Sequence, residues 1–128
     1  MELSSNRLSA TALAFVLAVP FADHVFAAQD NIGPVYVERV AVIALPAGGH
    51  LAGNMEVQIK GSFVVPAGVS CDNTYITTLK SVDSDKRMLA LLSMAQATKQ
   101  PVYLRITDDP SYTAFGGRCS LVWVNVAQ

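Results

Sequence analysis

A single stretch of helical periodicity interrupts a chain that is otherwise patterned as strands. Between residues 85 and 98, apolar side chains recur at the spacing i, i+3, i+4 and i+7, which is one stripe of a helix: Met88, Leu91, Leu92 and Ala95. Ser84 or Asp85 is the expected N-cap, and Pro101 disfavours continuation of the helix beyond Thr98. The pattern therefore predicts one helix, over residues 85–98.

Five other segments have the composition and alternation of strands, and proline or glycine ends the first two of them. They are residues 34–45, 55–65, 74–79, 102–107 and 120–126, while residues 29–33 look like a flexible lead. The order of three strands, a helix and two strands predicts a mainly β protein, a five-stranded OB-fold-like Greek-key barrel with the helix between strands 3 and 4. An open α+β sandwich with the helix across one face is the alternative.

The first 28 residues have the organisation of a secretory signal peptide. Arg7 precedes the apolar run 12–19, and the small pair Ala27-Ala28 closes the segment. The run is too short to span a bilayer in the mature protein. We therefore expect export to the periplasm or the medium, which leaves residues 29–128 as one small domain without a membrane span.

The expected mature domain is electrically neutral, although the whole chain carries a formal charge of −1. From Gln29 onward the chain contains eight acidic and eight basic residues. It therefore lacks the basic field that nucleic-acid binding requires, and it has no polybasic run to hold an anionic membrane.

The chain has two cysteines, Cys71 and Cys119. An exported domain with this pair predicts an intrachain disulfide, which would enclose the helix and the fourth strand. Two free buried thiols, or pairing between chains, are the alternatives. The absence of a Cys-x-x-Cys motif argues against a redox role.

Motifs for catalysis or cofactor binding are missing. The sequence has no Gly-x-Ser-x-Gly nucleophile elbow and no phosphate loop. His50 is the one histidine after the leader, and we expect it to be an exposed turn residue. Asp108-Asp109 precede Pro110 and read as turn initiation rather than as a calcium or acid–base pair. We therefore expect a protein that is not an enzyme, with no metal and no cofactor.

The aromatic residues suggest a different activity. Tyrosines on the expected strands, with Tyr112 and Phe115 in the loop 108–117, could form a surface on which a sugar ring stacks: Tyr36, Tyr75 and Tyr103. Each of them could instead fill a core or rim position. Phe63 and Trp123 sit in apolar runs, so we assign both to the core.

The segment from Met88 to Ile106, which contains Thr98-Lys-Gln-Pro-Val102 and lies between the two cysteines, resembles the binding subunit of the subtilase-cytotoxin class of AB5 toxins and their pertussis-like relatives. The resemblance spans about half of the mature chain. It implies an exported OB-fold, a homo-oligomeric ring (a pentamer), an enzymatic A subunit as partner and binding of host glycans.

The sugar-contacting residues of that family do not carry over. Its serine on the first strand would fall near Glu38 or Arg39, and its tyrosine on the fourth strand near Arg105 or Ile106. We therefore take as ligand-binding candidates the aromatic and charged residues around these positions: Tyr36, Glu38, Arg39, Tyr103, Arg105, Tyr112 and Phe115.

Leu89 and Met94 lie off the apolar stripe of the expected helix, so we predict that they contact neighbouring subunits. The alternative function is a monomeric periplasmic or secreted OB-fold protein with a structural or protein-interaction role. An enzyme or enzyme inhibitor is the weakest alternative, and an inhibitor would act through the loop 108–117.

Overall fold

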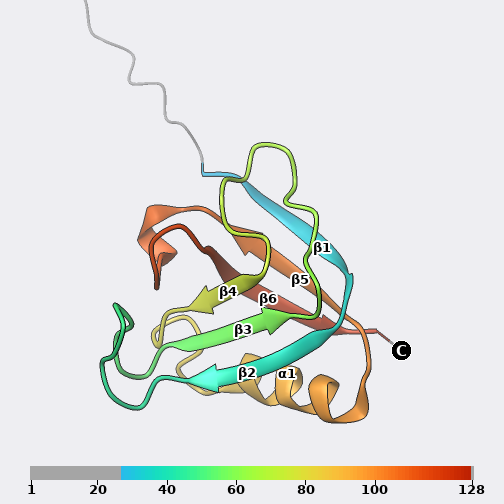
Figure 1. The fold of residues 1–128 in the computed structure, drawn as a ribbon, viewed down its shortest axis with the longest axis horizontal. Coiled ribbons are helices and arrows are strands. Elements are labelled where there is room, and N and C mark those ends of the chain that lie inside the picture. Colours follow the sequence, from blue (N-terminus) through green and yellow to red (C-terminus); the bar gives the residue numbers. More distant parts are fainter. Residues whose placement is uncertain (1–26, 128) are drawn as a thin grey trace, which may run out of the picture.

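The computed structural model describes residues 27–127, which form a mainly β protein with one helix (Figure 1). The expected signal peptide lies, apart from its last two residues, outside the described residues. The elements in chain order are β1 (Gln29–Val35), β2 (Val37–Val42), β3 (Met55–Ile59), β4 (Tyr75–Thr78), α1 (Arg87–Thr98), β5 (Val102–Thr107), a 3-10 turn (Pro110–Tyr112) and β6 (Cys119–Val126).

All six strands belong to one mixed sheet with the order β1-β5-β6-β4-β3-β2, in which only β4 and β6 are parallel. The sheet is open, yet its two edge strands are consecutive in the chain and only Tyr36 separates them. In Figure 1, β1 and β2 run as one bent segment from one edge to the other.

The expectation of five strands and a flexible lead is therefore wrong at the start of the domain. Residues 29–33 are part of β1, where Gln29 pairs with Thr107 and Ile32 with Leu104. This pairing uses main-chain groups and needs no apolar alternation, so the sequence pattern did not reveal it. The register shifts between Ile32 and Val35, around Pro34, which lacks the N–H that a regular ladder needs.

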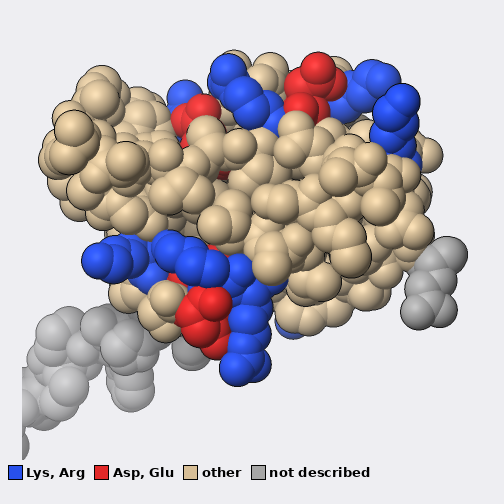
Figure 2. Space-filling model, turned by 90° about the horizontal axis from the view of Figure 1, so that it is seen from below, with Lys and Arg blue, Asp and Glu red and all other residues tan. Residues whose placement is uncertain are grey.

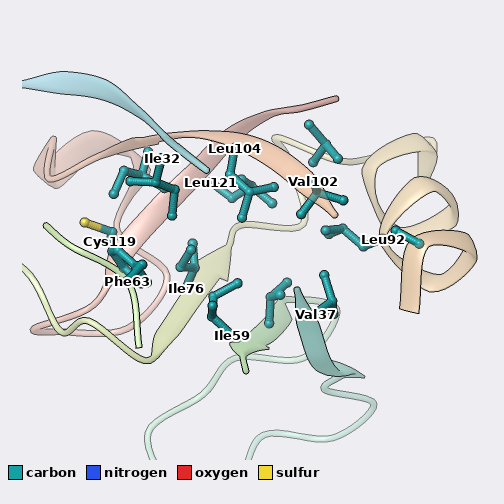
Figure 3. Close-up of a cluster of buried hydrophobic side chains, with 14 of the residues drawn as sticks. Ile32, Val37, Ile59, Phe63, Ile76, Leu92, Val102, Leu104, Cys119 and Leu121 are labelled. Atoms are coloured by element: carbon teal, nitrogen blue, oxygen red, sulfur yellow. The ribbon is translucent and has the colours of Figure 1, made fainter. Parts of the chain in front are cut away.

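The core lies on the inner face of the curved sheet, and α1 covers one end of it with Leu92 and Ala95 (Figure 3). Val102, Leu104 and Ile106 on β5 are fully buried, as their alternation predicted, and Phe63 is in the core as expected. Strand β3 contributes Val57 and Ile59 from the same clean alternation. It ends at Ile59, and the segment 60–65, expected to continue it, is not a strand.

Helix α1 begins at Arg87, later than expected, and neither Ser84 nor Asp85 caps it. Lys86 at the N-cap has left-handed backbone geometry (φ 61°). The carboxylate of buried Asp83 accepts hydrogen bonds from the N–H groups of Met88 and Leu89, both at 3.0 Å. Asp83 therefore satisfies two of the free N–H groups at the helix start, although it lies outside the helix.

The buried side of α1 is rotated relative to the predicted stripe. Leu92 and Ala95 are buried as predicted, but Leu91 is 37% exposed and Leu89 packs against the core. The helix meets the sheet along Leu92, so its neighbours at i−3 and i+3 turn inward with it. Among the described residues, no helix is long and apolar enough to cross a membrane.

The assignment of Trp123 to the core is wrong, because β6 contains a bulge. Arg105 pairs with Trp123 but Ile106 pairs with Leu121, which leaves Val122 as an extra residue on β6. The bulge shifts the alternation by one position, so Leu121 and Val124 are both buried and Trp123 is 44% exposed.

The predicted disulfide between Cys71 and Cys119 is present, with Cα atoms 5.1 Å apart. It joins the loop before β4 to the first residue of β6, beside a parallel ladder of only two residue pairs, Ile76 with Cys119 and Thr77 with Ser120. The disulfide therefore holds together the two strands that share the shortest ladder of the sheet.

We predict that the variant Cys71→Ala/Cys119→Ala folds with a free energy of unfolding lower by about 4 kcal/mol, because a closed loop of this length restricts the unfolded chain. For a domain of this size the loss corresponds to a fall in Tm on the order of 20 °C. Calorimetry of the variant, and of the wild-type protein with and without reductant, measures it. A change within experimental error would contradict the prediction.

Candidate functional site

Four large side chains gather on the outer face of β5 and β6, and we call them the aromatic platform: Tyr103, Arg105, Tyr112 and Trp123. Arg105 and Trp123 are cross-strand partners, and Tyr103 lies two residues before Arg105 on the same face of β5. Tyr103 is 38% exposed, Tyr112 37% and Trp123 44%, so the three rings face solvent.

Arg105 is oriented by two neighbours on this face. Its Nε donates a hydrogen bond to Oδ1 of Asn31 on β1 at 3.0 Å, and its guanidinium carbon lies 5.9 Å from the centre of the Trp123 ring. A hollow of about 410 Å³ adjoins the platform, lined by Gln29, Val82, Arg105, Tyr112, Val122 and Trp123. The site thus combines exposed rings, one cation and side-chain amides.

The 3-10 turn before β6 places Tyr112 on the platform. Asp109 caps the turn by accepting hydrogen bonds from the hydroxyl and the N–H of Ser111, at 2.6 and 2.9 Å. These two bonds hold the pKa of the Asp109 carboxyl below its usual value. Ser120 Oγ on β6 donates to the carbonyl of Tyr112 at 2.6 Å. Asp109 therefore acts in turn formation, as the sequence predicted.

Tyr36 and Glu38 lie apart from the platform, in a groove between β2 and the end of α1. The groove has a volume of about 500 Å³ and is lined by Tyr36, Val37, Glu38, Lys60, Ala95, Gln96, Lys99 and Gln100. Gln96 Nε2 donates to the carbonyl of Glu38 at 2.8 Å, which ties the helix to the strand. Tyr36, 50% exposed, is the one aromatic side chain in this lining.

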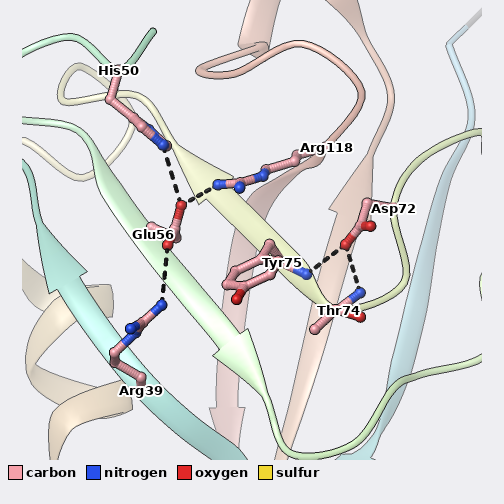
Figure 4. A network of polar contacts seen from close by, with 7 residues as sticks. All are labelled: Arg39, His50, Glu56, Asp72, Thr74, Tyr75 and Arg118. Atoms are coloured by element: carbon pink, nitrogen blue, oxygen red, sulfur yellow. Dashed lines mark hydrogen bonds and ion pairs between the residues drawn. The ribbon is translucent and has the colours of Figure 1, made fainter. Parts of the chain in front are cut away.

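Arg39 and Phe115 belong to a third cluster, around the half-buried carboxylate of Glu56 on β3 (Figure 4). Arg118 donates a hydrogen bond to Glu56, His50 Nε2 lies 3.3 Å from the same carboxylate, and Arg39 reaches it at 3.8 Å. The His50 ring stacks on Phe115 with ring centres 4.3 Å apart. His50 is thus half-buried and paired, so the expectation of an exposed turn histidine is wrong.

Arg118 connects this cluster to β4. Its guanidinium lies over the rings of Tyr75 and Phe115, 4.6 and 4.4 Å from their centres. Nearby, the Asp72 carboxylate accepts hydrogen bonds from the N–H groups of Tyr75 and Thr74, both at 2.8 Å (Figure 4). These bonds, with a smaller contribution from the charge of Arg118, hold the pKa of Asp72 below its usual value.

The seven predicted ligand residues are therefore divided among three places. The platform contains Tyr103, Arg105 and Tyr112; the groove contains Tyr36 and Glu38; the Glu56 cluster contains Arg39 and Phe115. Sequence reasoning missed Trp123, which completes the platform. Its pairing with Arg105 depends on the bulge at Val122, and nothing in the local sequence marks that bulge.

Within residues 27–127, no group of three or more histidine, cysteine, aspartate or glutamate side chains is arranged to hold a metal ion. No protein-family model, no curated protein and no solved structure matches the chain. The function is therefore inferred from the geometry of the described residues.

We predict that Asp72→Asn lowers the free energy of unfolding at neutral pH and has no effect in strong acid. The folded-state pKa of Asp72 lies below 3.8, its usual value. The stabilisation is therefore present above pH 3.8 and is lost as the pH falls through the lower folded-state pKa. Solvent screening limits it to about 1 kcal/mol or less.

Urea unfolding at a series of pH values measures this difference. Asp85→Asn is the matched control, because it removes the same charge from an exposed pair with Arg87. We expect the control to change stability little at every pH, and an Asp72→Asn effect that persisted in strong acid would contradict the assignment.

Proposed function

We propose that this protein is an exported, non-enzymatic binding module that recognises glycans through the aromatic platform. The observation that carries the proposal is the convergence of three exposed aromatic rings and Arg105 on one face of β5 and β6. Exposed tyrosine and tryptophan rings are apolar in the middle and polar at one end, which suits a ligand with one apolar face and many hydroxyls.

The polar neighbours support a sugar rather than an apolar ligand. Gln29 borders the hollow, and Asn31 contacts Arg105, so amide donors and acceptors surround the rings. Arg105 offers N–H donors besides the one that Asn31 accepts, which suits hydroxyl or carboxylate oxygens. The groove at Tyr36 has a single aromatic ring, so we rank it below the platform.

We further propose that the architecture is of the OB-fold type. Support comes from the strand order, because β1 and β2 are joined through Tyr36 and occupy the two edges of the sheet. Counted as one bent strand, they give the order 1-2-3-5-4-1 with the helix between strands 3 and 4. OB-folds commonly bind oligosaccharides or oligonucleotides, and the neutral charge of the mature domain favours the former.

Self-association into a ring with an enzymatic partner subunit is the remaining part of the proposal. It rests on the resemblance of residues 88–106 to toxin binding subunits and on the apolar side chains that α1 leaves exposed. Met94 is 46% and Leu91 37% exposed, and Ala90 and Ala97 are exposed beside them. Leu89 packs inward and is not a good candidate for an interface.

A monomeric protein-interaction module is the second candidate function. It is favoured by the departures of this chain from the sugar-contacting residues of the toxin subunits at Glu38, Arg39 and Arg105. The same platform would then bind a protein, since exposed tryptophan, tyrosine and arginine are the residues enriched in interface hot spots.

We predict that the exported protein binds one or more sugars on a glycan array and that Trp123→Ala weakens binding about tenfold or more, because the stacking surface is lost. Tyr36→Ala is the matched control, since it removes a similarly exposed aromatic ring from the groove instead. Titration calorimetry with the best array sugar compares the three proteins. Loss of binding in the control alone would move the site to the groove, and a wild-type protein that binds no glycan would refute the proposal.

We predict a native mass several times that of one chain, and that Met94→Asp shifts the protein toward the monomer by placing a charge in the interface. Native mass spectrometry measures both. Ser62→Asp, an exposed change in another loop, serves as the control. A wild-type monomer would contradict the ring and favour the second candidate function.

A further inference from the structure

The loop that joins β2 to β3 carries a surface that the proposed function does not use. Residues 40–53 contain no charged side chain, and His50 is the only titratable group among them. We call the exposed apolar side chains of this loop and of the end of β2 the apolar tip: Val42, Leu45 and Leu51, which are 46%, 78% and 62% exposed. The loop projects from the end of the β2–β3 hairpin, at the left of Figure 1.

The apolar tip is held outward by its own backbone. Ala47 and His50 exchange two hydrogen bonds at the turn, and the loop closes where Ile43 N–H donates to the Asn54 carbonyl at 2.9 Å. The His50 ring, stacked on Phe115, ties the loop to the segment that precedes β6. The two leucines are thus exposed on an ordered loop, and they cannot turn into the core without breaking these bonds.

Cationic side chains lie beside the base of the apolar tip. Lys86 Nζ lies 3.4 Å from the Gly53 carbonyl, and the side chain of Lys80 packs against Gly53. Neither lysine has a carboxylate within 4.0 Å among the described residues. In Figure 2, the left end of the molecule, on the side of this loop, is free of charged residues on the face shown, and both basic and acidic side chains lie beyond it.

A hollow of about 460 Å³ adjoins the tip on the side of these lysines. It is lined by Leu51, Ala52, Asn54, Leu79, Lys80, Ser81 and Ser84. The lining therefore combines apolar side chains with a lysine and two serines beside Leu51. This combination matches a lipid, whose acyl chain is apolar and whose headgroup carries phosphate oxygens.

We propose that the apolar tip inserts into the surface of an anionic membrane, with Leu45 and Leu51 below the headgroups and Lys80 and Lys86 at headgroup level. The leucines belong to the loop, and the two lysines lie beside its base at Gly53. A membrane interface has the same arrangement, with apolar acyl chains inside and anionic headgroups outside. The neutral net charge of the domain does not oppose this, because attraction to the headgroups acts over about a Debye length and is therefore local.

Co-sedimentation with vesicles tests the proposal. The exported protein is mixed with vesicles of phosphatidylcholine and phosphatidylglycerol in equal parts, or of phosphatidylcholine alone. We expect binding to the mixed vesicles, weaker binding to the neutral ones, and a loss of about tenfold or more in Leu45→Asp/Leu51→Asp and in Lys80→Gln/Lys86→Gln.

Val64→Asp/Ala67→Asp is the matched control. It adds the same two charges at exposed positions of the loop 61–69, which follows the opposite end of β3. We expect it to bind like the wild-type protein, and circular dichroism checks that each variant is folded. Two results would overturn the proposal directly: vesicle binding by Leu45→Asp/Leu51→Asp that equals wild-type binding, or an equal loss of binding in the control. A Leu45→Asp/Leu51→Asp variant that changes only the native mass would also overturn it and would assign the tip to contacts between copies of the chain. Glycan binding by the tip variant is expected to be unchanged, which separates this test from that of the platform.

Discussion

The parallel junction between β4 and β6 is the contact on which the rest of the structure depends. On one side of it β2, β3 and β4 form an antiparallel unit, and on the other side β1, β5 and β6 form another. Two residue pairs alone make the ladder between them. Three further contacts cross the same junction: the disulfide between Cys71 and Cys119, the bond from Asp72 N–H to the Gly117 carbonyl, and the ion pair between Arg118 and Glu56. A short ladder is thus reinforced by one covalent and two polar connections.

The same junction positions the candidate sites. Ser120, directly after the cysteine of β6, donates a hydrogen bond to the carbonyl of Tyr112 and so helps to build the aromatic platform. Phe115, a few residues earlier, stacks on the His50 ring, and Arg118 binds the Glu56 carboxylate that His50 also contacts, so both help to hold the loop of the apolar tip. The segment from residue 112 to 120 therefore links both proposed binding surfaces to the most constrained part of the sheet. This is a rigid arrangement, and rigid elements place binding side chains accurately.

Several elements could be predicted from local pattern. Strand β5 has the predicted bounds, because Val102, Leu104 and Ile106 alternate with polar residues over its whole length. The helix was predicted to within two residues of its start, and the cysteine pairing followed from the count of two cysteines together with the expectation of export. The errors have physical causes. Strand β1 is made by main-chain pairing, the helix start is capped by Asp83 from outside the helix, and the bulge at Val122 puts Leu121 and Trp123 on opposite faces.

The sequence by itself determined the mainly β class, the single helix and the disulfide, because these depend on periodicity and on the count of two cysteines. Only the tertiary structure decided which side chains share a surface. Tyr103, Arg105, Tyr112 and Trp123 come from two strands and a turn, and a one-residue bulge sets whether the tryptophan faces solvent or core. Such a register depends on the pairing of distant strands, whose free energy is spread over the whole sheet, so no local stretch of sequence encodes it.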